Sequence, residues 1–398
     1  MNSAPTELPI LLAPQPPADP APYRTILAAI GSICVVGLAT GLTLPLVSLR
    51  LVQADASAVA IAALAALPAV GTIGISFALP RLTRAFGAKA LMVGAMLLSC
   101  ASILVLATPY SLPSWVLSRL GMGVATGILF ALGEARILEI TGERARGRWT
   151  GLYATMLTAC QFAGPTLLAV VGTVSSVSIV IAAALHGVSI ALLARTRWSS
   201  PVRGNEPLLS LAEFIRHSLP LAAAVLFFAM FDSTMLSLLP VYGLKIGFLT
   251  SVALLMVTVV FLGDACLQIP IGWAADRFGR PVVHSGCALL SGLVALALPG
   301  LVGAAAMWPS LFLLGSAAGG VYTLAIVRIG DRFGGGRLIA ANAFVGLLWG
   351  AGSLSGPLLG GLAMAALKPH GLMLLVAAGA LACLVLMSHR TGLISRRS

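Results

Sequence analysis

The chain has 398 residues, of which 59% are hydrophobic and 9% are charged, and its mean hydropathy is +1.03. Soluble domains carry about a quarter charged residues, so this composition excludes an ordinary soluble enzyme or binding module. The formal net charge is +12. The basic residues lie between long apolar segments, and this placement argues against a nucleic-acid partner.

Residues 1–24 are rich in proline and are expected to form a disordered tail. They lack a basic region followed by an apolar one, so they are not predicted to be a signal peptide. Apolar segments then recur, each long enough to cross a hydrocarbon core of about 30 Å as a helix. The twelve predicted spans are 25–48, 57–80, 88–108, 113–137, 149–170, 173–194, 218–241, 247–273, 282–302, 306–329, 338–364 and 370–389.

The spans divide into an N-terminal six-helix bundle at 25–194 and a C-terminal six-helix bundle at 218–389. A linker at 195–217 joins the bundles, and 390–398 form a short tail. If the N-terminus is placed in the cytoplasm, every Lys and Arg lies on the cytoplasmic side except Arg50, Arg119, Lys245 and Lys368. This bias predicts that the linker and both termini are cytoplasmic.

An internal duplication is indicated by features that recur 192 residues apart. Gly164-Pro165 recurs as Gly356-Pro357, both inside apolar segments where they are expected to bend helices. Phe86-Gly87 recurs as Phe278-Gly279 at the same offset. The sequence therefore predicts an all-α integral membrane protein whose twelve helices form two pseudo-symmetric bundles.

A motif follows the eighth span: Gly272-Trp-Ala-Ala-Asp276-Arg277-Phe-Gly279-Arg280, preceded by Gln268-Ile-Pro. It resembles the G-x-x-x-D-R-x-G-R loop of the major facilitator superfamily (MFS). In the first half Arg84 stands where Asp276 is expected and Ala88 stands where Arg280 is expected. The resemblance implies a gating latch that is stronger in the second half.

Further stretches resemble the same family. Arg119-Leu-Gly-Met-Gly123 is similar to its R-x-x-x-G pattern, whose arginine is often linked to proton coupling. Around Gly164-Pro165 the antiporter motif is incomplete, so the direction of transport stays open. The closest subgroup is the YcaD-like branch, which the stretches Leu44-Pro-Leu-Val-Ser-Leu-Arg50 and Gln268-Ile-Pro-Ile-Gly272 resemble.

Four charged residues break the internal symmetry. Their counterparts at the 192-residue offset are uncharged, and charges within a membrane usually face a cavity or a partner. The four are Asp232, Asp264, Arg119 and Glu134, opposite Thr40, Thr72, Leu311 and Ile326 respectively.

Asp232 is interpreted as a protonatable or cation-facing carboxylate in the cavity, or as a partner of a nearby polar group. Asp264 and Gln268 are assigned to gating or packing, and a coupling role for Asp264 stays open. Arg119 either enters the cavity or extends to the outer interface. Glu134 is predicted to join the inner gate, with Arg328 or Arg148.

Neutral polar side chains complete the predicted cavity, and each has the alternative of binding a neighbouring helix. They are Thr40, Gln161, Tyr322, Asn342 and Trp349. The lining they describe is mainly apolar with few polar anchors, as expected for a small organic ligand.

The sequence thus predicts a secondary active transporter in the bacterial inner membrane, a monomer that moves a small organic solute by alternating access with protons. A facilitative uniporter, a copper importer and a non-transporting sensor are the alternatives. Met230 and Met235 do not share a helical face, which disfavours copper. Neither a cofactor nor a resident metal is expected, because no catalytic, phosphate-binding or metal motif is present.

Overall fold

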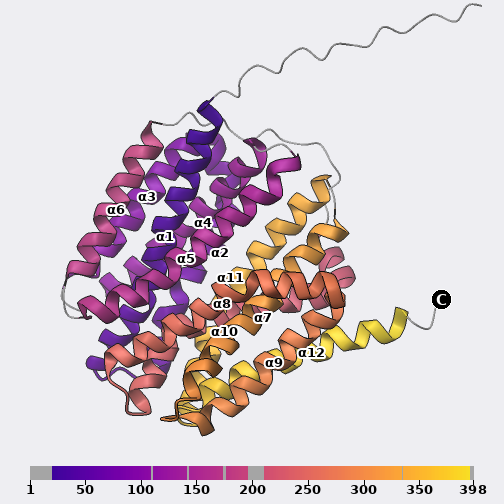
Figure 1. Ribbon diagram of the computed structural model, residues 1–398. Helices are drawn as coiled ribbons and strands as arrows, with labels where there is room; N and C mark the ends of the chain where they lie inside the picture. The colour runs from indigo at the N-terminus through magenta and orange to yellow at the C-terminus, as the bar shows by residue number, and fades with distance from the viewer. Residues whose placement is uncertain are drawn as a thin grey trace, which may run out of the picture.

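The computed structural model describes residues 20–108, 111–140, 143–173, 176–195, 210–333 and 335–394. These residues form twelve α-helices and one short 3-10 helix (Figure 1). The helices are α1 (Pro20–Gln53), α2 (Ala58–Phe86), α3 (Ala88–Val105), α4 (Leu112–Ile140), α5 (Glu143–Val171), α6 (Val177–Ala194), α7 (Leu211–Lys245), α8 (Thr250–Phe278), α9 (Arg280–Ala297), η1 (Leu298–Leu301), α10 (Met307–Arg332), α11 (Gly335–Ala366) and α12 (Gly371–Ile394).

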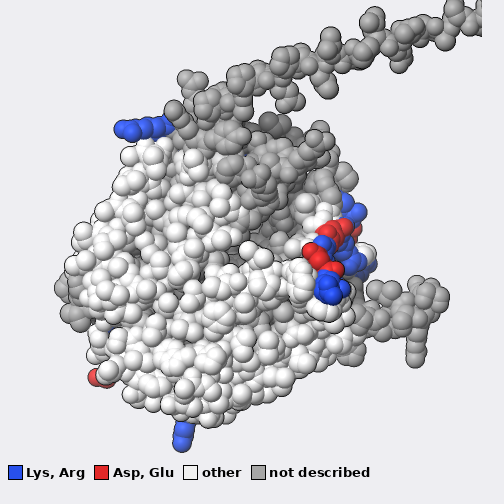
Figure 2. Space-filling model, in the orientation of Figure 1, with Lys and Arg blue, Asp and Glu red and all other residues white. Residues whose placement is uncertain are grey.

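Within the described residues, eleven helices are long and apolar enough to cross a membrane, and α5 contributes a shorter apolar stretch, Thr155–Val171. This agrees with the twelve spans expected from hydropathy. Figure 2 shows why: the visible described surface is almost entirely uncharged, and its acidic and basic side chains gather mainly at one end. A surface without charge over most of its area suits contact with hydrocarbon.

Six helices pack into each bundle, and the two bundles lie side by side (Figure 1). In the first bundle α1 packs on α5, α2 on α4 and α3 on α6. The second bundle repeats these pairs as α7 on α11, α8 on α10 and α9 on α12. The predicted duplication is therefore visible as a repeated packing scheme.

Small residues make the repeated contacts close. A Cβ added at Gly123 of α4 would meet the carbonyl of Pro68 in α2, and one added at Gly315 of α10 would meet the carbonyl of Val260 in α8. Both residues of the second pair lie 192 positions after those of the first. Membrane helices gain packing energy from such approaches, since lipid provides no hydrophobic drive between them.

The two Gly-Pro pairs also make close contacts. Gly164 of α5 lies against the backbone of Gly41 and Leu42 in α1, and Gly356 of α11 lies against the carbonyl of Met230 in α7. Pro165 and Pro357 lie inside their helices. The structure thus gives these glycines a packing role, and the predicted bend at each pair stays a prediction.

The helices extend past the expected domain boundaries. α1 begins at Pro20, α7 begins at Leu211 and α12 ends at Ile394, so the boundaries at 24/25, 217/218 and 389/390 fall inside helices. Before Pro220, Ser218 departs from helical geometry and divides α7 into a short helical segment that carries Glu213, Arg216 and His217 and a longer membrane segment. Hydropathy marks only that second segment. Residues 1–19, 196–209 and 395–398 of the predicted tails and linker lie outside the described residues.

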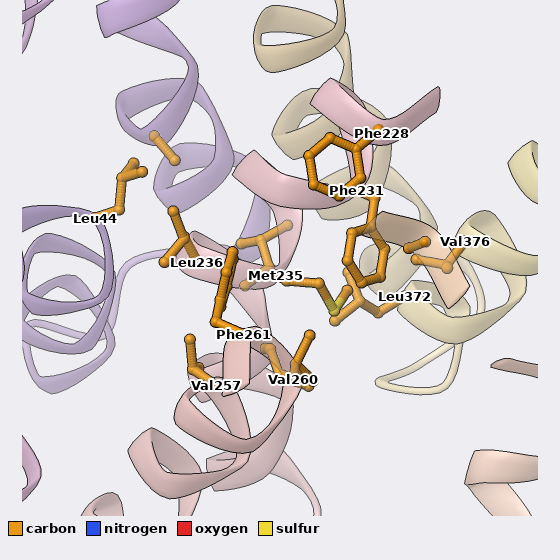
Figure 3. Close-up of a cluster of buried hydrophobic side chains, with 14 of the residues drawn as sticks. Leu44, Phe228, Phe231, Met235, Leu236, Val257, Val260, Phe261, Leu372 and Val376 are labelled. Carbon is orange, nitrogen blue, oxygen red and sulfur yellow. The ribbon is translucent and has the colours of Figure 1, made fainter. Parts of the chain in front are cut away.

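The bundles meet through α1 with α7, α5 with α8 and α2 with α11. Figure 3 shows part of this apolar interface, where Leu44 of α1 lies near Leu236 of α7, beside Val257 and Phe261 of α8. We call the end of the bundles where α2 ends and α9 begins the basic end. Near the opposite end, Gly361 of α11 lies against Ala62 of α2.

Candidate functional site

Asp232 of α7 lies at the boundary between the two bundles. Its carboxylate accepts hydrogen bonds from Nε2 of Gln161 in α5, at 3.3 Å to Oδ1 and 3.2 Å to Oδ2. Asp232 is only 6% exposed and Gln161 only 9%. The two residues were predicted separately as cavity candidates, and the structure brings them together across the bundles.

Asp264 of α8 faces α10 of its own bundle. Oδ1 of Asp264 accepts from Nε2 of Gln268 at 2.5 Å, and Oε1 of Gln268 accepts from the hydroxyl of Thr323 at 2.6 Å. A Cβ added at Gly319 would collide with the Asp264 carboxylate, so that glycine makes room for it. Asp264 precedes Asp276 by twelve residues, about 18 Å along a helix, which separates it from the predicted gate.

Three aromatic rings meet beside these carboxyls, and we call them the aromatic cluster: Phe228, Tyr322 and Trp349. Phe228 stacks on Tyr322 with centroids 5.0 Å apart and an interplanar angle of 19°. Trp349 meets Tyr322 nearly at a right angle, with centroids 5.2 Å apart at 71°, and it lies 5.7 Å from the Phe228 ring. Phe228 precedes Asp232 by one helical turn, so both lie on one face of α7.

Arg119 is buried inside the first bundle, 1% exposed. Its Nη1 donates to the hydroxyl of Thr43 in α1 at 3.1 Å and contacts the sulfur of Met122 at 3.6 Å. Nε and Nη2 have no hydrogen-bond partner among the described residues. Arg119 therefore does not extend to the outer interface, which removes one of the two interpretations drawn from the sequence.

Glu134 lies in α4 within electrostatic range of Tyr153 and Tyr322. The predicted pairing with Arg328 is absent. Arg328 instead bonds Nδ1 of His284 at 3.0 Å, and Nε2 of that ring donates to the carbonyl of Val321 at 2.9 Å. The other predicted partner, Arg148, has a side chain outside the described residues.

Two weaker candidates are half-buried. Thr40 lies on α1, and Asn342 lies on α11 two turns before Trp349. Residues seven apart share a face of a helix, so Asn342 and Trp349 point to the same side of α11. The structure gives neither Thr40 nor Asn342 a described side-chain hydrogen bond.

The motif after α8 forms ion pairs in the second half, and its role as a gating latch stays a prediction. Arg280 pairs with Asp276 at 3.3 Å and also with Asp331 at the end of α10. Gly279 ends α8 with a φ of +94°, a conformation that favours glycine. In the first half, the one hydrogen bond of the Arg84 side chain to a described residue is donated to the carbonyl of Pro80 in its own helix at 3.1 Å.

Two latch residues differ from their predicted roles. No atom lies within 4 Å of a Cβ added at Gly272, so this glycine does not permit a close helix contact here. Arg277 lies over the rings of Trp273 and Phe278, 5.7 and 5.9 Å from their centroids. It makes a cation–π contact rather than an ion pair with a described residue.

Sequence reasoning missed Phe228, Thr323 and Asp331. Phe228 had a usable signal, because it lies one turn before an intramembrane aspartate. Thr323 and Asp331 had no such signal, since their roles depend on the packing of α10 against α8. Across the described residues, no group of three or more His, Cys, Asp or Glu side chains could hold a metal ion.

A sequence profile of the family described as "Major Facilitator Superfamily" matches residues 29–257 and 221–392. The chain is 24% identical over 346 residues to the "Uncharacterized MFS-type transporter YfkF" of Bacillus subtilis, covering 83% of this chain and 86% of that protein. It is also 24% identical over 288 residues to the "Uncharacterized MFS-type transporter YcaD" of Shigella flexneri, covering 70% and 73%.

Solved structures share the fold. A point mutant of the nucleoside transporter NupG matches with a TM-score of 0.73 at 11% identity, over 93% of this chain and 99% of that one. A D-xylose-proton symporter matches at 0.69 and 18% identity, over 92% and 97%. A bacterial homologue of the human lysosomal transporter Spinster, inward-facing and unoccupied, matches at 0.68 and 13% identity, over 94% and 96%.

Proposed function

Since this chain belongs to the major facilitator superfamily, we propose that it is a proton-coupled secondary transporter that moves a small organic solute by alternating access. The observation that carries this proposal is the buried bond between Asp232 and Gln161. This bond joins a titratable group of the second bundle to the first bundle. It lies at the interface where the bundles would move apart during alternating access.

The Asp232 carboxylate supplies the coupling. A charge inside a membrane costs at least about 2.5–3.5 kcal/mol on insertion scales. The ionised carboxylate therefore needs polar partners, whereas the protonated carboxyl is stable in apolar surroundings. The ionised carboxylate accepts from the Gln161 amide across the interface. A proton on Asp232 removes the charge that attracts this amide, which weakens the contact and allows the bundles to rearrange. Asp264, in the same bundle, supports the role by adding a second buried carboxyl nearby.

The contacts between the bundles support an arrangement in which the end opposite the basic end is closed. Among the described residues, Thr166 of α5 bonds Thr258 of α8 at 3.1 Å, and Gly361 lies against Ala62. These contacts lie between the middle of the bundles and the opposite end. With the basic end in the cytoplasm, as the positive-inside bias favours, this is an inward-facing state, with both termini cytoplasmic, in a bacterial inner membrane.

A transport assay tests the proposal. Purified protein is first screened against a ligand panel by thermal shift, and each ligand that stabilises it is then assayed in proteoliposomes with and without a pH gradient. The wild type is expected to show saturable transport, with accumulation or extrusion that the gradient drives. Saturable flux that does not depend on the pH gradient would indicate a facilitative uniporter. The absence of saturable flux with every ligand that binds would indicate a sensor.

The matched variants are Asp232→Asn and Asp55→Asn. Both remove one carboxylate, but Asp55 is exposed in the loop after α1, and its φ of +53° is one that asparagine tolerates. Asp232→Asn is expected to abolish gradient-driven accumulation while retaining exchange of solute down its own gradient. Asp55→Asn is expected to behave as the wild type. Accumulation that survives in Asp232→Asn contradicts the coupling role.

A further inference from the structure

Two rings of the aromatic cluster, Tyr322 and Trp349, are only partly buried and meet at a corner. Phe228 is buried and covers one face of Tyr322 by stacking. Tyr322 and Trp349 keep part of their surface accessible and stand at 71° to each other. Two perpendicular rings with accessible surface form the walls of a corner, and tryptophan and tyrosine are the rings that bind cations best.

Carboxyl groups surround this corner, and they make it negative when they are ionised. The carboxyls of Glu134, Asp232 and Asp264 lie in electrostatic range of Tyr322. They come from α4, α7 and α8, so carboxyls from both bundles surround the ring. Sites lined by one sign of charge with low-dielectric walls concentrate the opposite charge.

Among the described residues, no ion pair joins Asp232 or Asp264 to a basic side chain. Arg119 is the only buried Lys or Arg among the described residues. Its guanidinium contacts Thr43 and Met122 within the first bundle, and neither residue belongs to the aromatic cluster. The described hydrogen-bond partners of Asp232 and Asp264 are the amides of Gln161 and Gln268, which are neutral.

We propose that the transported solute is an organic cation, bound at the corner of Tyr322 and Trp349 and neutralised by Asp232 and Asp264. The inference rests on the proposed transport function and names the substrate class of that site. The rings supply apolar area and the attraction of their faces for positive charge. The carboxyls select the sign of the charge, and a cation that takes the place of a proton at Asp232 would exchange with it.

A pair of probes with one shape and opposite charge tests the sign. Equilibrium binding of tritiated tetraphenylphosphonium to purified protein in nanodiscs is compared with its competition by unlabelled tetraphenylphosphonium and by tetraphenylborate. Empty nanodiscs give the background from lipid partitioning. We expect saturable binding that the unlabelled cation displaces and the anion does not. Equal displacement by the anion, or the absence of saturable binding, overturns the proposal.

Substitutions then locate the probe. Trp349→Leu and Tyr322→Leu should each weaken tetraphenylphosphonium binding about 3- to 30-fold, the range of one desolvated cation–π contact. Tyr322→Phe keeps a ring and should retain affinity within about 3-fold. Trp273→Leu is the control, because that tryptophan is 62% exposed and its ring already contacts Arg277. If Trp349→Leu and Trp273→Leu have the same affinity, the corner is not the site.

Carboxyl variants complete the test. Asp232→Asn and Asp264→Asn should each weaken binding of the cation, and Asp55→Asn should not. Tyr322→Phe and the probe pair on wild-type protein keep the proposal testable if a leucine variant fails to fold. Because the assay measures binding at equilibrium, its result is independent of transport. Cation binding without saturable flux contradicts the proposed function alone, whereas gradient-driven flux of a neutral or anionic solute without cation binding contradicts this inference alone.

Discussion

The two bundles share their packing and differ in their charges. Gly123 packs against the backbone of Pro68 in the first bundle, and Gly315 packs against that of Val260 in the second. Gly71 and Leu120 make a further contact of this kind, which Gly263 and Phe312 repeat. Each pair follows the same 192-residue offset. Helices at these positions approach until backbone touches backbone, which only glycine allows. What the duplication preserved is therefore the geometry that holds each bundle together.

The difference is clearest at one equivalent position. Thr72 of α2 donates its hydroxyl to the carbonyl of Gly123 in α4 at 2.9 Å, and the facing Gly127 would meet Thr72 if it had a Cβ. In the second bundle Asp264 takes the place of Thr72 and Gly319 takes the place of Gly127. A residue that fastens two helices in one half is thus a buried carboxyl in the other. The shared positions build the scaffold of each bundle, and the unshared charges are the ones to which we assign the proposed coupling.

The largest expected effect tests the shared scaffold. Gly123→Ala and Gly315→Ala should each lower stability by about 1–3 kcal/mol, because the added methyl group collides with a neighbouring backbone. Thermal unfolding of the purified variants measures this. Gly94→Ala, at a helical glycine with no atom within 4 Å of an added Cβ, should be neutral or slightly stabilising. A large loss of stability in one of these two variants and none in the other would contradict the structural equivalence of the two bundles.

The second effect tests the position at which the bundles differ. Thr72→Val removes one partly buried hydrogen bond and should cost about 1 kcal/mol of stability. It should leave the dependence of transport on the pH gradient unchanged. Asp264→Asn should not lower stability, because the amide oxygen can still accept from Gln268, but it should change the gradient dependence. Thermal unfolding and proteoliposome flux separate the two outcomes, and a gradient effect in Thr72→Val would contradict the division of roles.

The smallest effect concerns the latch. Arg280→Gln breaks the ion pairs with Asp276 and Asp331. Because these side chains are more than a third exposed, water screens both pairs, so transport rates should change only slightly. Arg84→Gln removes only a contact within its own helix and should leave the rate unchanged. Initial rates of uptake measure both, and equal effects would show that the first-half loop also acts as a latch.

Much of the fold could be predicted from the sequence, because hydropathy marks helices that cross lipid and the offset of Gly164-Pro165 and Gly356-Pro357 reveals the duplication. Hydropathy did not mark the polar ends of α7 and α12, which continue the helices beyond the apolar segments. The site was predicted in part. Asp232 and Gln161 were found because polar groups in apolar helices are conspicuous.

The remaining site features depend on how the helices face one another. Arg328 lies beside His284 and not Glu134, and no spacing along the chain shows which helices are neighbours. Phe228 was hidden for a different reason. Its position one turn before Asp232 was its one signal in the sequence, and a phenylalanine is inconspicuous in a chain this apolar until its ring is seen to stack on Tyr322.

The central claim is that Asp232 and Gln161 act together across the boundary between the bundles. The most direct test is a double-mutant cycle with Asp232→Asn, Gln161→Leu and the double variant, measuring the ratio of solute flux with and without a pH gradient. If the pair acts as a unit, each single variant should lose most of the gradient dependence and the double variant should lose no more than Asp232→Asn alone. Independent effects that add, or full gradient dependence in Asp232→Asn, would contradict the account.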